Sequence, residues 1–331
     1  MKKLVASSFM IFILFSSCIL RTTGCSESHF KESESESFVQ GYKVSKPVNL
    51  KISTSGGSIT TIGSNNNNNN DSIEVSFIVT ERGKVLDIDM EGLKKIAEVE
   101  IANDKSSLEI NIIKIYERNI SVGFSIKTPN NTSADLVTSG GNISLTDLIG
   151  RQSINTSGGN MNFKNIFGDV NAHTSGGYIS LDNVNGKTNI STSGGNINAS
   201  TIKPSLIAQT SGGNIDLKKI QGLVDVYTSG GSIHLNEISG SIKAFTSGGK
   251  ISADIIRLSE KLELGTSGGN ISASLPAGLG LDLDLSADKI ETPLNNFTGF
   301  NKEGRIKGQM NGGGIPVNIS TSGGHMMVTY K

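Results

Sequence analysis

The chain has 331 residues, and its 30 Lys and Arg residues balance 30 Asp and Glu residues, so the formal net charge is zero. It contains no Trp, and aromatic residues make up only 5% of the chain. With balanced charge and no basic stripe, the sequence gives no support for nucleic-acid binding or for electrostatic binding to a membrane surface. The scarcity of aromatic rings also argues against a sugar site built by ring stacking, but it leaves hydrogen-bonded glycan contact open.

Residues 1–25 are predicted to be a signal segment rather than part of the fold. Lys2 and Lys3 form a positively charged start, and the apolar run Leu4–Phe15 that follows is too short to span a bilayer comfortably. The segment predicts export across the inner membrane.

Both cysteines of the chain lie in this segment, and each resembles a bacterial lipobox, in which a lipid is attached to the Cys. The candidates for lipidation are Cys25 and Cys18, although Phe15 or Thr22 stands where the lipobox pattern prefers Leu. The polar stretch after Cys25 favours that residue. A plain secretory signal with incidental cysteines is the alternative.

Residues 26–45 are rich in Ser and Glu and are predicted to be a disordered polar tether. A β-solenoid domain is expected over 46–331, and its first repeat lies in 46–62, where we expect the solenoid to start. The Asn65–Asn70 run is predicted to be a low-complexity loop.

Residues 71–136 interrupt the repeat and are predicted to form a β-rich insert that caps the N-terminal end of the solenoid. Alternating apolar residues predict strands at Asp71–Thr80, Leu108–Ile115 and Asn119–Lys127, and a short helix is expected within Asp87–Val99. A stack of strands needs such a cap, because its end exposes unpaired backbone groups.

The tetrapeptide Thr-Ser-Gly-Gly occurs ten times, and seven consecutive copies are spaced by 18 residues. The copies begin at Thr54, Thr138, Thr156, Thr174, Thr192, Thr210, Thr228, Thr246, Thr266 and Thr321. Fixed self-similarity of this kind indicates a repeat architecture. The regular repeats span 138–275, residues 276–331 are expected to form irregular C-terminal coils, and the chain is expected to close with one more coil at the last copy.

Within each repeat, apolar and polar residues alternate, as in a strand with one buried face. Each unit is predicted to hold two short strands, one after the Gly-Gly pair and one leading into the next Thr. By parity the Thr of the motif faces inward, where it forms a hydrogen-bonded ladder, and the Ser faces outward. The glycines are expected at corners, where a residue without Cβ can adopt positive φ.

A unit of 18 residues cannot bury its apolar face alone, but it can do so against identical neighbours. The predicted fold is therefore all-β, a single-stranded parallel β-solenoid (β-helix) of about 18-residue coils, in which like residues stack on like.

The sequence resembles the DUF4097 family of bacterial β-solenoid proteins over about residues 46–331. The resemblance lies in the repeated T-S-G-G-x-I, in the strand Val122–Thr128 with Pro129, and in the ending G-Q-M-N-G-G-G-I-P-V-N-I-S-T-S-G-G-H-M. It implies a β-solenoid and a role as an adhesin, and it brings no catalytic motif to carry over. The uniform repeats and the long N-terminal insert depart from the family pattern.

The sequence offers no clear chemistry. The four histidines (His29, His173, His234 and His325) show no metal-ligand spacing, and the Asp residues of the repeats form no column of calcium ligands. The motif serines have no base nearby, and the Gly-Gly-Asn segments match no phosphate-binding fingerprint. No catalytic residue, metal or cofactor is therefore predicted.

The predicted function is that of a non-enzymatic protein of the bacterial cell envelope, an adhesin or surface scaffold anchored at most by a lipid, at the cell surface or in the periplasm. The surface it would present is a polar ladder that includes Asn142, Asn160, Asn196, Asn214 and Asn270. Candidate partners are a glycan, cell-wall polymer or another surface protein, and not nucleic acid. The alternatives are a periplasmic β-helix that binds or processes polysaccharide, and an ice-binding protein.

Overall fold

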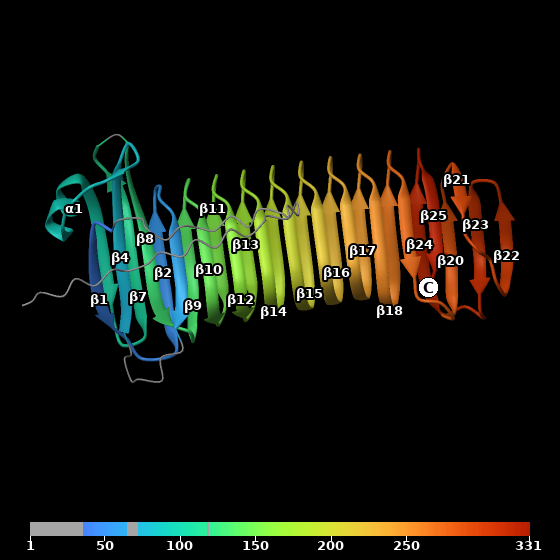
Figure 1. The fold of residues 1–331 in the computed structure, drawn as a ribbon, viewed down its shortest axis with the longest axis horizontal. Helices are drawn as coiled ribbons and strands as arrows, with labels where there is room; N and C mark the ends of the chain where they lie inside the picture. Colours follow the sequence, from blue (N-terminus) through green and yellow to red (C-terminus); the bar gives the residue numbers. More distant parts are fainter. Residues whose placement is uncertain (1–35, 65–71, 118) are drawn as a thin grey trace, which may run out of the picture. The chain divides into compact units, whose positions relative to one another are not determined.

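A computed structural model describes residues 36–64, 72–117 and 119–331. The predicted signal segment with Cys18 and Cys25, residues 26–35 of the predicted tether, His29 and the Asn65–Asn70 run lie outside the described residues. The prediction of a disordered tether up to residue 45 is wrong in its second half, because Phe38–Lys43 form a strand that pairs with residues 72–77. The described residues form one stack of β-strands, with α1 (Met90–Ile96) as their single helix (Figure 1). None of the helical structure described is long and apolar enough to cross a membrane.

The regular body is a parallel β-solenoid, as the repeat predicts. Its strands are β10 (Ile143–Ile149), β11 (Gln152–Thr156), β12 (Met161–Phe167), β13 (Val170–Thr174), β14 (Ile179–Thr192), β15 (Ile197–Thr210), β16 (Ile215–Thr228), β17 (Ile233–Thr246), β18 (Ile251–Thr266) and β19 (Ile271–Leu275). Neighbouring coils pair in parallel at a step of 18 residues, for example Ile179 with Ile197 and Thr192 with Thr210. From β14 to β18 the two predicted short strands of a coil form one continuous bent strand.

The core lies inside the coils, where the alternation places the apolar residues. The Ile or Met five residues after each motif Thr is buried, and Ile197 and Ile215 are fully inaccessible. The Thr side chains also face inward. Thr192 Oγ1 donates to the carbonyl oxygen of Gly177 in the preceding coil at 2.8 Å and accepts from the N–H of Gly195 at 3.3 Å. The prediction of an inward hydrogen-bonded Thr ladder is confirmed.

The motif glycines do not serve the purpose that the sequence suggested. Among the second glycines of the described motifs only Gly57 has a positive φ, of 116°, so the expected positive φ is wrong for the regular coils. These residues are glycine because coils approach closely there. A Cβ on Gly195 would overlap the carbonyl oxygen of Gly177.

The left-handed corner lies instead nine residues after the motif Thr. The residues at this position have φ between 54° and 59°, and they are Asp147, Asn165, Asn183, Thr201, Lys219 and Glu237. Asn and Asp tolerate this conformation better than other residues with a side chain, which accounts for half of the set. The later glycine, three residues on, also has positive φ in several coils, as expected, for example 140° at Gly150.

At the N-terminal end the order of the coils differs from the order of the chain. The strands here are β1 (Phe38–Lys43), β2 (Val48–Thr54), β3 (Ile59–Ser64), β4 (Ser72–Glu81), β5 (Lys84–Val85), β6 (Ala97–Asn103), β7 (Ser107–Ile115), β8 (Ile120–Pro129) and β9 (Thr132–Thr138). The coil of β2 and β3 lies between the coil of β7 and β8 and the coil of β9 and β10, with parallel pairing on both sides. The expectation that the first motif copy starts the stack is therefore wrong, because residues 107–129 supply the outer coil.

The remaining N-terminal elements cover this outer coil. Strand β4 pairs antiparallel with β8, β1 pairs with β4, and β6 pairs with β7. The helix is shorter than the expected range because Ala97 already begins β6. It starts where Asp89 caps it by accepting from the N–H of Gly92, and it buries Leu93.

The C-terminal end is interleaved in the same way. Its strands are β20 (Leu281–Ser286), β21 (Lys289–Glu291), β22 (Phe297–Lys302), β23 (Arg305–Met310), β24 (Ile315–Thr321) and β25 (His325–Tyr330). The coil of β24 and β25 lies between the coil of β18 and β19 and the coil of β20 and β21. Beyond β20, β23 and then β22 continue as antiparallel strands at the end opposite β1 (Figure 1).

The predicted last coil at the Thr321 copy is present, but it lies inside the stack and not at its end. This copy carries the complete motif, and Thr321 Oγ1 bonds to the carbonyl oxygen of Gly269 at 2.7 Å, as an internal coil does. The coil of β20 and β21 has no motif, and its outer neighbour β23 is antiparallel, which suits it to the end of the stack.

Candidate functional site

The predicted ladder asparagines lie directly after the Gly-Gly pairs of their coils. Asn142 lies beside Asn160 and Asn196 beside Asn214, whereas Asn270 lies beside His325. Each Oδ1 atom accepts a hydrogen bond from the backbone N–H of the equivalent residue in the next coil, at 2.9 Å from Asn142 to Asn160, Asn196 to Asn214 and Asn270 to His325. The side-chain oxygens of this column therefore hold neighbouring coils together.

The same column also contains residues other than Asn. Tyr178 donates its N–H to Asn160 Oδ1 at 3.0 Å, and Ser232 donates its N–H to Asn214 Oδ1 at 2.8 Å. A ligand would meet the outward amide groups of the asparagines rather than these bonded oxygens. Ligand binding by this ladder stays a prediction.

A shallow hollow of about 400 Å³ lies on the outer face formed by β14, β15, β16 and β17. We call it the trough. Two rows of outward side chains line it, and paired residues of successive strands form each row: Ser180, Asn198, Asp216 and His234 in one row, and Asp182, Ser200, Lys218 and Asn236 in the other. Between the rows lie Leu181, Ala199 and Leu217, which are at most 4% exposed, so their side chains belong to the core.

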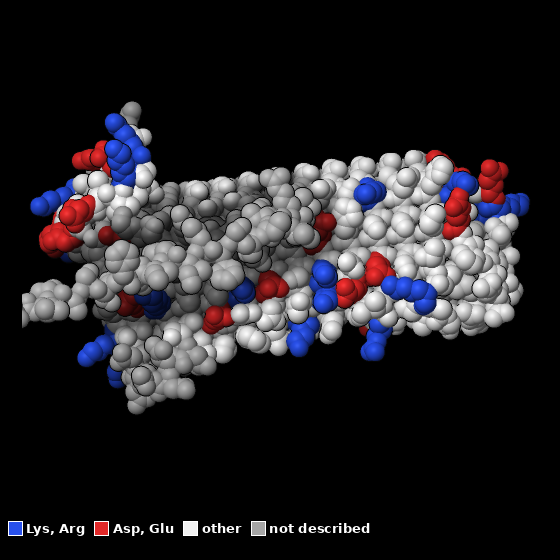
Figure 2. Space-filling view, viewed as in Figure 1, with Lys and Arg blue, Asp and Glu red and all other residues white. Residues whose placement is uncertain are grey.

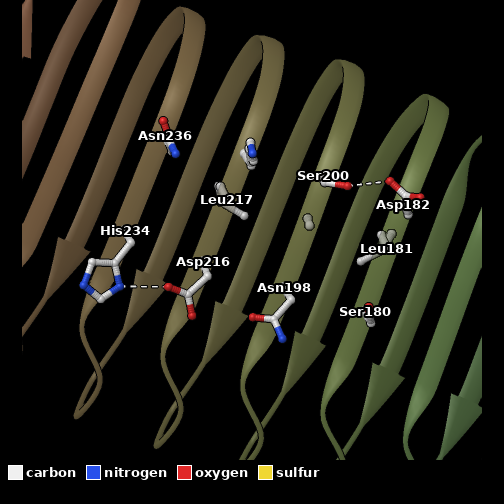
Figure 3. A pocket seen from close by; sticks show the side chains of 11 residues that line it. Ser180, Leu181, Asp182, Asn198, Ser200, Asp216, Leu217, His234 and Asn236 are labelled. Carbon is white, nitrogen blue, oxygen red and sulfur yellow. Dashed lines mark hydrogen bonds and ion pairs between the residues drawn. The ribbon is translucent and has the colours of Figure 1, made fainter. Parts of the chain in front are cut away.

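Two bonds between neighbouring coils order the polar groups of the trough. His234 Nδ1 lies 2.8 Å from Asp216 Oδ1, and Ser200 Oγ donates to Asp182 Oδ1 at 2.5 Å (Figure 3). The side chains of His234 and Asp216 are 39% and 49% exposed, so the pair lies at the surface. Asn198 lies between the two bonded pairs, on the strand between Asp182 and Asp216.

The Asp216–His234 pair has the arrangement in which a carboxylate orients an imidazole base. Ser252 occupies the same row in the next coil, where it pairs with His234. Among the described residues, however, no hydrogen bond joins Ser252 to His234. The pair therefore lacks the bonded nucleophile of a catalytic triad.

A second hollow of about 310 Å³ lies near the N-terminal end, on the face formed by β7, β2, β9 and β11. Lys51 Nζ and Glu109 Oε1 are 2.8 Å apart in it. The hydrogen bond from Lys51 lowers the pKa of Glu109, and the same bond raises the pKa of Lys51. Two of the charges in this hollow are thus already engaged with each other.

The remaining histidines and acidic residues form no metal site in the described part of the chain. His173 Nδ1 lies 2.8 Å from Ser191 Oγ, and it belongs to a different column from His234. Among the residues that the structure describes, no group of three or more His, Cys, Asp or Glu side chains could hold a metal ion.

Charged side chains are few and of mixed sign on the face of the stack shown in Figure 2. Lys and Arg alternate with Asp and Glu there, and most described residues of that face are uncharged. The described residues visible on this face offer a long polyanion no continuous basic track.

The sequence gives no local signal for the trough. The residues six and eight positions after the motif Thr are polar in the trough, but they are also polar in neighbouring repeats, for example Ser252 and Asp254.

Comparisons with known proteins extend the description of the fold. A sequence comparison with curated proteins finds no match. Among solved structures, the chain is similar to a putative adhesin from Bacteroides fragilis NCTC 9343, with 16% identity and a TM-score of 0.44 over 67% of this chain and 96% of that one. It is also similar to a putative adhesin from Parabacteroides distasonis ATCC 8503, with 15% identity and a TM-score of 0.38 over 88% of this chain and 97% of that one.

The repeats, the inward Thr ladder and the β-solenoid agree with the family resemblance of the sequence. The family model described as Toastrack DUF4097 matches residues 42–329, which is most of the chain. The chain belongs to the Toastrack DUF4097 family.

Proposed function

We propose that this protein is a non-enzymatic adhesin or surface scaffold of the bacterial cell envelope. The observation that carries the proposal is the in-register stacking of the coils, which repeats the same outward polar positions along a stiff surface. Such a surface suits contact with an extended partner better than it suits the enclosure of a small substrate.

The position of the first described strand is compatible with this role. Strand β1 lies at one end of the stack, and β22 lies at the other (Figure 1). An anchor within the predicted signal segment, at Cys25 or Cys18, would be joined to the stack through β1, the first described strand, and β22 lies at the opposite end of the stack.

Among the residues that the structure describes, no nucleophile is hydrogen-bonded to the Asp216–His234 pair, which favours contact over chemistry. Hydrolysis of a polysaccharide or ester by the purified protein, lost in His234→Ala, would contradict the non-enzymatic role.

Protease treatment of intact cells that produce the protein tests the envelope location. We expect the chain to be cleaved on whole cells, or to become accessible once the envelope is opened, and to fractionate with membranes if a Cys carries lipid. Recovery of the chain from the cytoplasm, uncleaved under both conditions, would refute the proposal. Cleavage on whole cells would favour adhesion, and cleavage only after opening would favour a periplasmic scaffold.

A further inference from the structure

The trough has the dimensions of a site for a chain-like ligand. Its two rows cross four successive strands, which are about 4.8 Å apart, so the rows extend over roughly 14 Å along the stack. The hollow is shallow, and its floor is the backbone around Leu181, Ala199 and Leu217. A ligand in it would lie along the stack axis and meet equivalent positions at equal intervals.

The side chains of the trough favour a partner rich in hydroxyl groups. Its two central strands present Asn198, Ser200, Asp216 and Lys218, and its two outer strands present Ser180, Asp182, His234 and Asn236. Amide, carboxylate and imidazole groups accept or donate hydrogen bonds in the plane of the group, which suits the hydroxyls of a sugar ring. No aromatic residue lines the trough, so recognition would rest on hydrogen bonds.

The charges of the trough discriminate against polyanions. Asp182 and Asp216 place two carboxylates beside the path of the ligand, against one Lys, Lys218. A phosphate or sulfate polymer would be repelled by this negative charge, whereas a neutral polymer would not be repelled and an amine-bearing polymer would be attracted.

Part of the site is ordered before a ligand arrives. The Asp216–His234 and Asp182–Ser200 contacts each fix a carboxylate through one of its oxygens. The second oxygen of each carboxylate accepts no hydrogen bond from the described residues, so it is available to a ligand. Fixed polar groups reduce the entropy lost on binding.

We propose that the trough binds a neutral or amine-bearing polysaccharide, with the sugar chain lying along the stack across β14 to β17. This inference rests on the proposed adhesin or scaffold function and names the class of partner. The cell-fractionation experiment above does not depend on it, so the two can fail separately.

The test is co-sedimentation of the purified protein with chitin, cellulose and isolated peptidoglycan sacculi, with heparin as a soluble polyanion competitor. The first variant, Ser200→Trp, fills the centre of the trough. Its matched control is Ser274→Trp, because Ser274 occupies the equivalent position of β19, outside the trough, and is half-buried like Ser200.

We expect the unaltered protein and Ser274→Trp to bind at least one of these polymers, and Ser200→Trp to bind it at least tenfold more weakly. A second pair removes one amide without adding bulk. Asn198→Ala is expected to weaken binding about fivefold, the value of one hydrogen bond. Its control, Asn162→Ala, is exposed in the same row outside the trough and is expected to bind normally.

Three outcomes would overturn the proposal. The first is no sedimentation with any of the three polymers. The second is equal loss in the trough variants and their controls, which would place the binding elsewhere. The third is binding that heparin abolishes at low ionic strength, which would identify a polyanion site. Thermal unfolding of all four variants verifies that each is folded.

Discussion

At the scale of single residues, the second glycine of each motif sets how closely two coils approach. A Cβ on any of these glycines in the regular body would overlap the carbonyl oxygen of the equivalent glycine in the preceding coil. The first glycine of the motif has more room, since the nearest atoms to a Cβ on Gly194 are 3.7 Å away or more. The close approach of two coils thus requires the second glycine of the motif but not the first.

This difference predicts opposite results for two neighbouring substitutions. Gly195→Ala should destabilise the fold by at least about 3 kcal/mol, because backbone of the adjacent coil must move. Gly194→Ala should change stability by less than about 1 kcal/mol, and it can be stabilising because it restricts the unfolded chain. Chemical denaturation of both variants measures the difference, and equal midpoints would show that close coil contact does not explain the second glycine.

Tyr42 is a second residue with a measurable consequence. It is 8% exposed, and its hydroxyl has no hydrogen-bond partner among the described residues. Burial raises the pKa of Tyr42 from 10.0 to about 12. The folded state therefore holds the phenolic proton more tightly than the unfolded state does. The stability that this provides is complete below about pH 10 and is lost as the pH rises toward about 12.

Tyr42→Phe should keep full stability at neutral pH, because no hydrogen bond is lost, and its stability should fall less steeply between about pH 10 and 12. Urea unfolding of both proteins at neutral and alkaline pH provides the comparison. Parallel stability curves for the two proteins would exclude the ionisation of Tyr42 as a contributor.

Much of this residue-level structure follows from the sequence. The inward Thr, the buried Ile and the outward Ser are fixed by alternation within an 18-residue period. The reason for the second glycine could not be predicted in the same way, because it depends on an atom of the neighbouring coil. The left-handed residue, such as Thr201 or Lys219, was also missed, since its identity varies from coil to coil.

At the scale of a strand, an inward and an outward position at the start of β15 should tolerate a charged side chain differently. Ile197 is fully buried, whereas Asn196, just before the strand, is exposed and accepts the N–H of Asn214. Ile197→Asp should cost several kcal/mol, because it buries an unpaired carboxylate. Asn196→Asp keeps the oxygen acceptor and should cost less than about 1 kcal/mol.

Thermal unfolding of these two variants, monitored by circular dichroism, tests the assignment of the faces. A similar decrease in the unfolding temperature of both variants would mean that the burial of Ile197 in β15 does not stabilise this coil.

The strands of the regular body were predictable because each coil repeats the same pattern, but their continuity through the corner was not. The predicted helix was too long because the local pattern of Met90, Leu93 and Ile96 does not reveal that Ala97 pairs as part of β6. The trough was also missed. It is formed by residues of four successive coils and not by a pattern within one repeat.

At the scale of the whole described stack, both ends are interleaved. The coil of β2 and β3 and the coil of β24 and β25 each have parallel neighbours on both sides. The local pattern cannot reveal this order, because it specifies which residues form a coil but not which coil is its neighbour. The repeat alone therefore predicted a stack in chain order.

Interleaving predicts that the last residues hold the C-terminal end together. Deletion of residues 315–331 removes β24 and β25, on which β20 and β21 stack. We expect residues 276–314 to become sensitive to protease while the regular coils stay resistant, as judged by limited proteolysis and mass spectrometry. If 276–314 remained as resistant as in the full chain, its position would not depend on the interleaved coil.

The constant 18-residue step also has a consequence for how such a protein can change over generations. Recombination between near-identical repeats of the gene would add or remove whole coils, each changing the length of the stack by about 4.8 Å. Every new coil would form the same hydrogen bonds between Thr and Gly with the coils on both sides of it. The N-terminal and C-terminal ends of the stack would not need to change. The length of the stack could therefore vary in discrete increments while the fold stays the same.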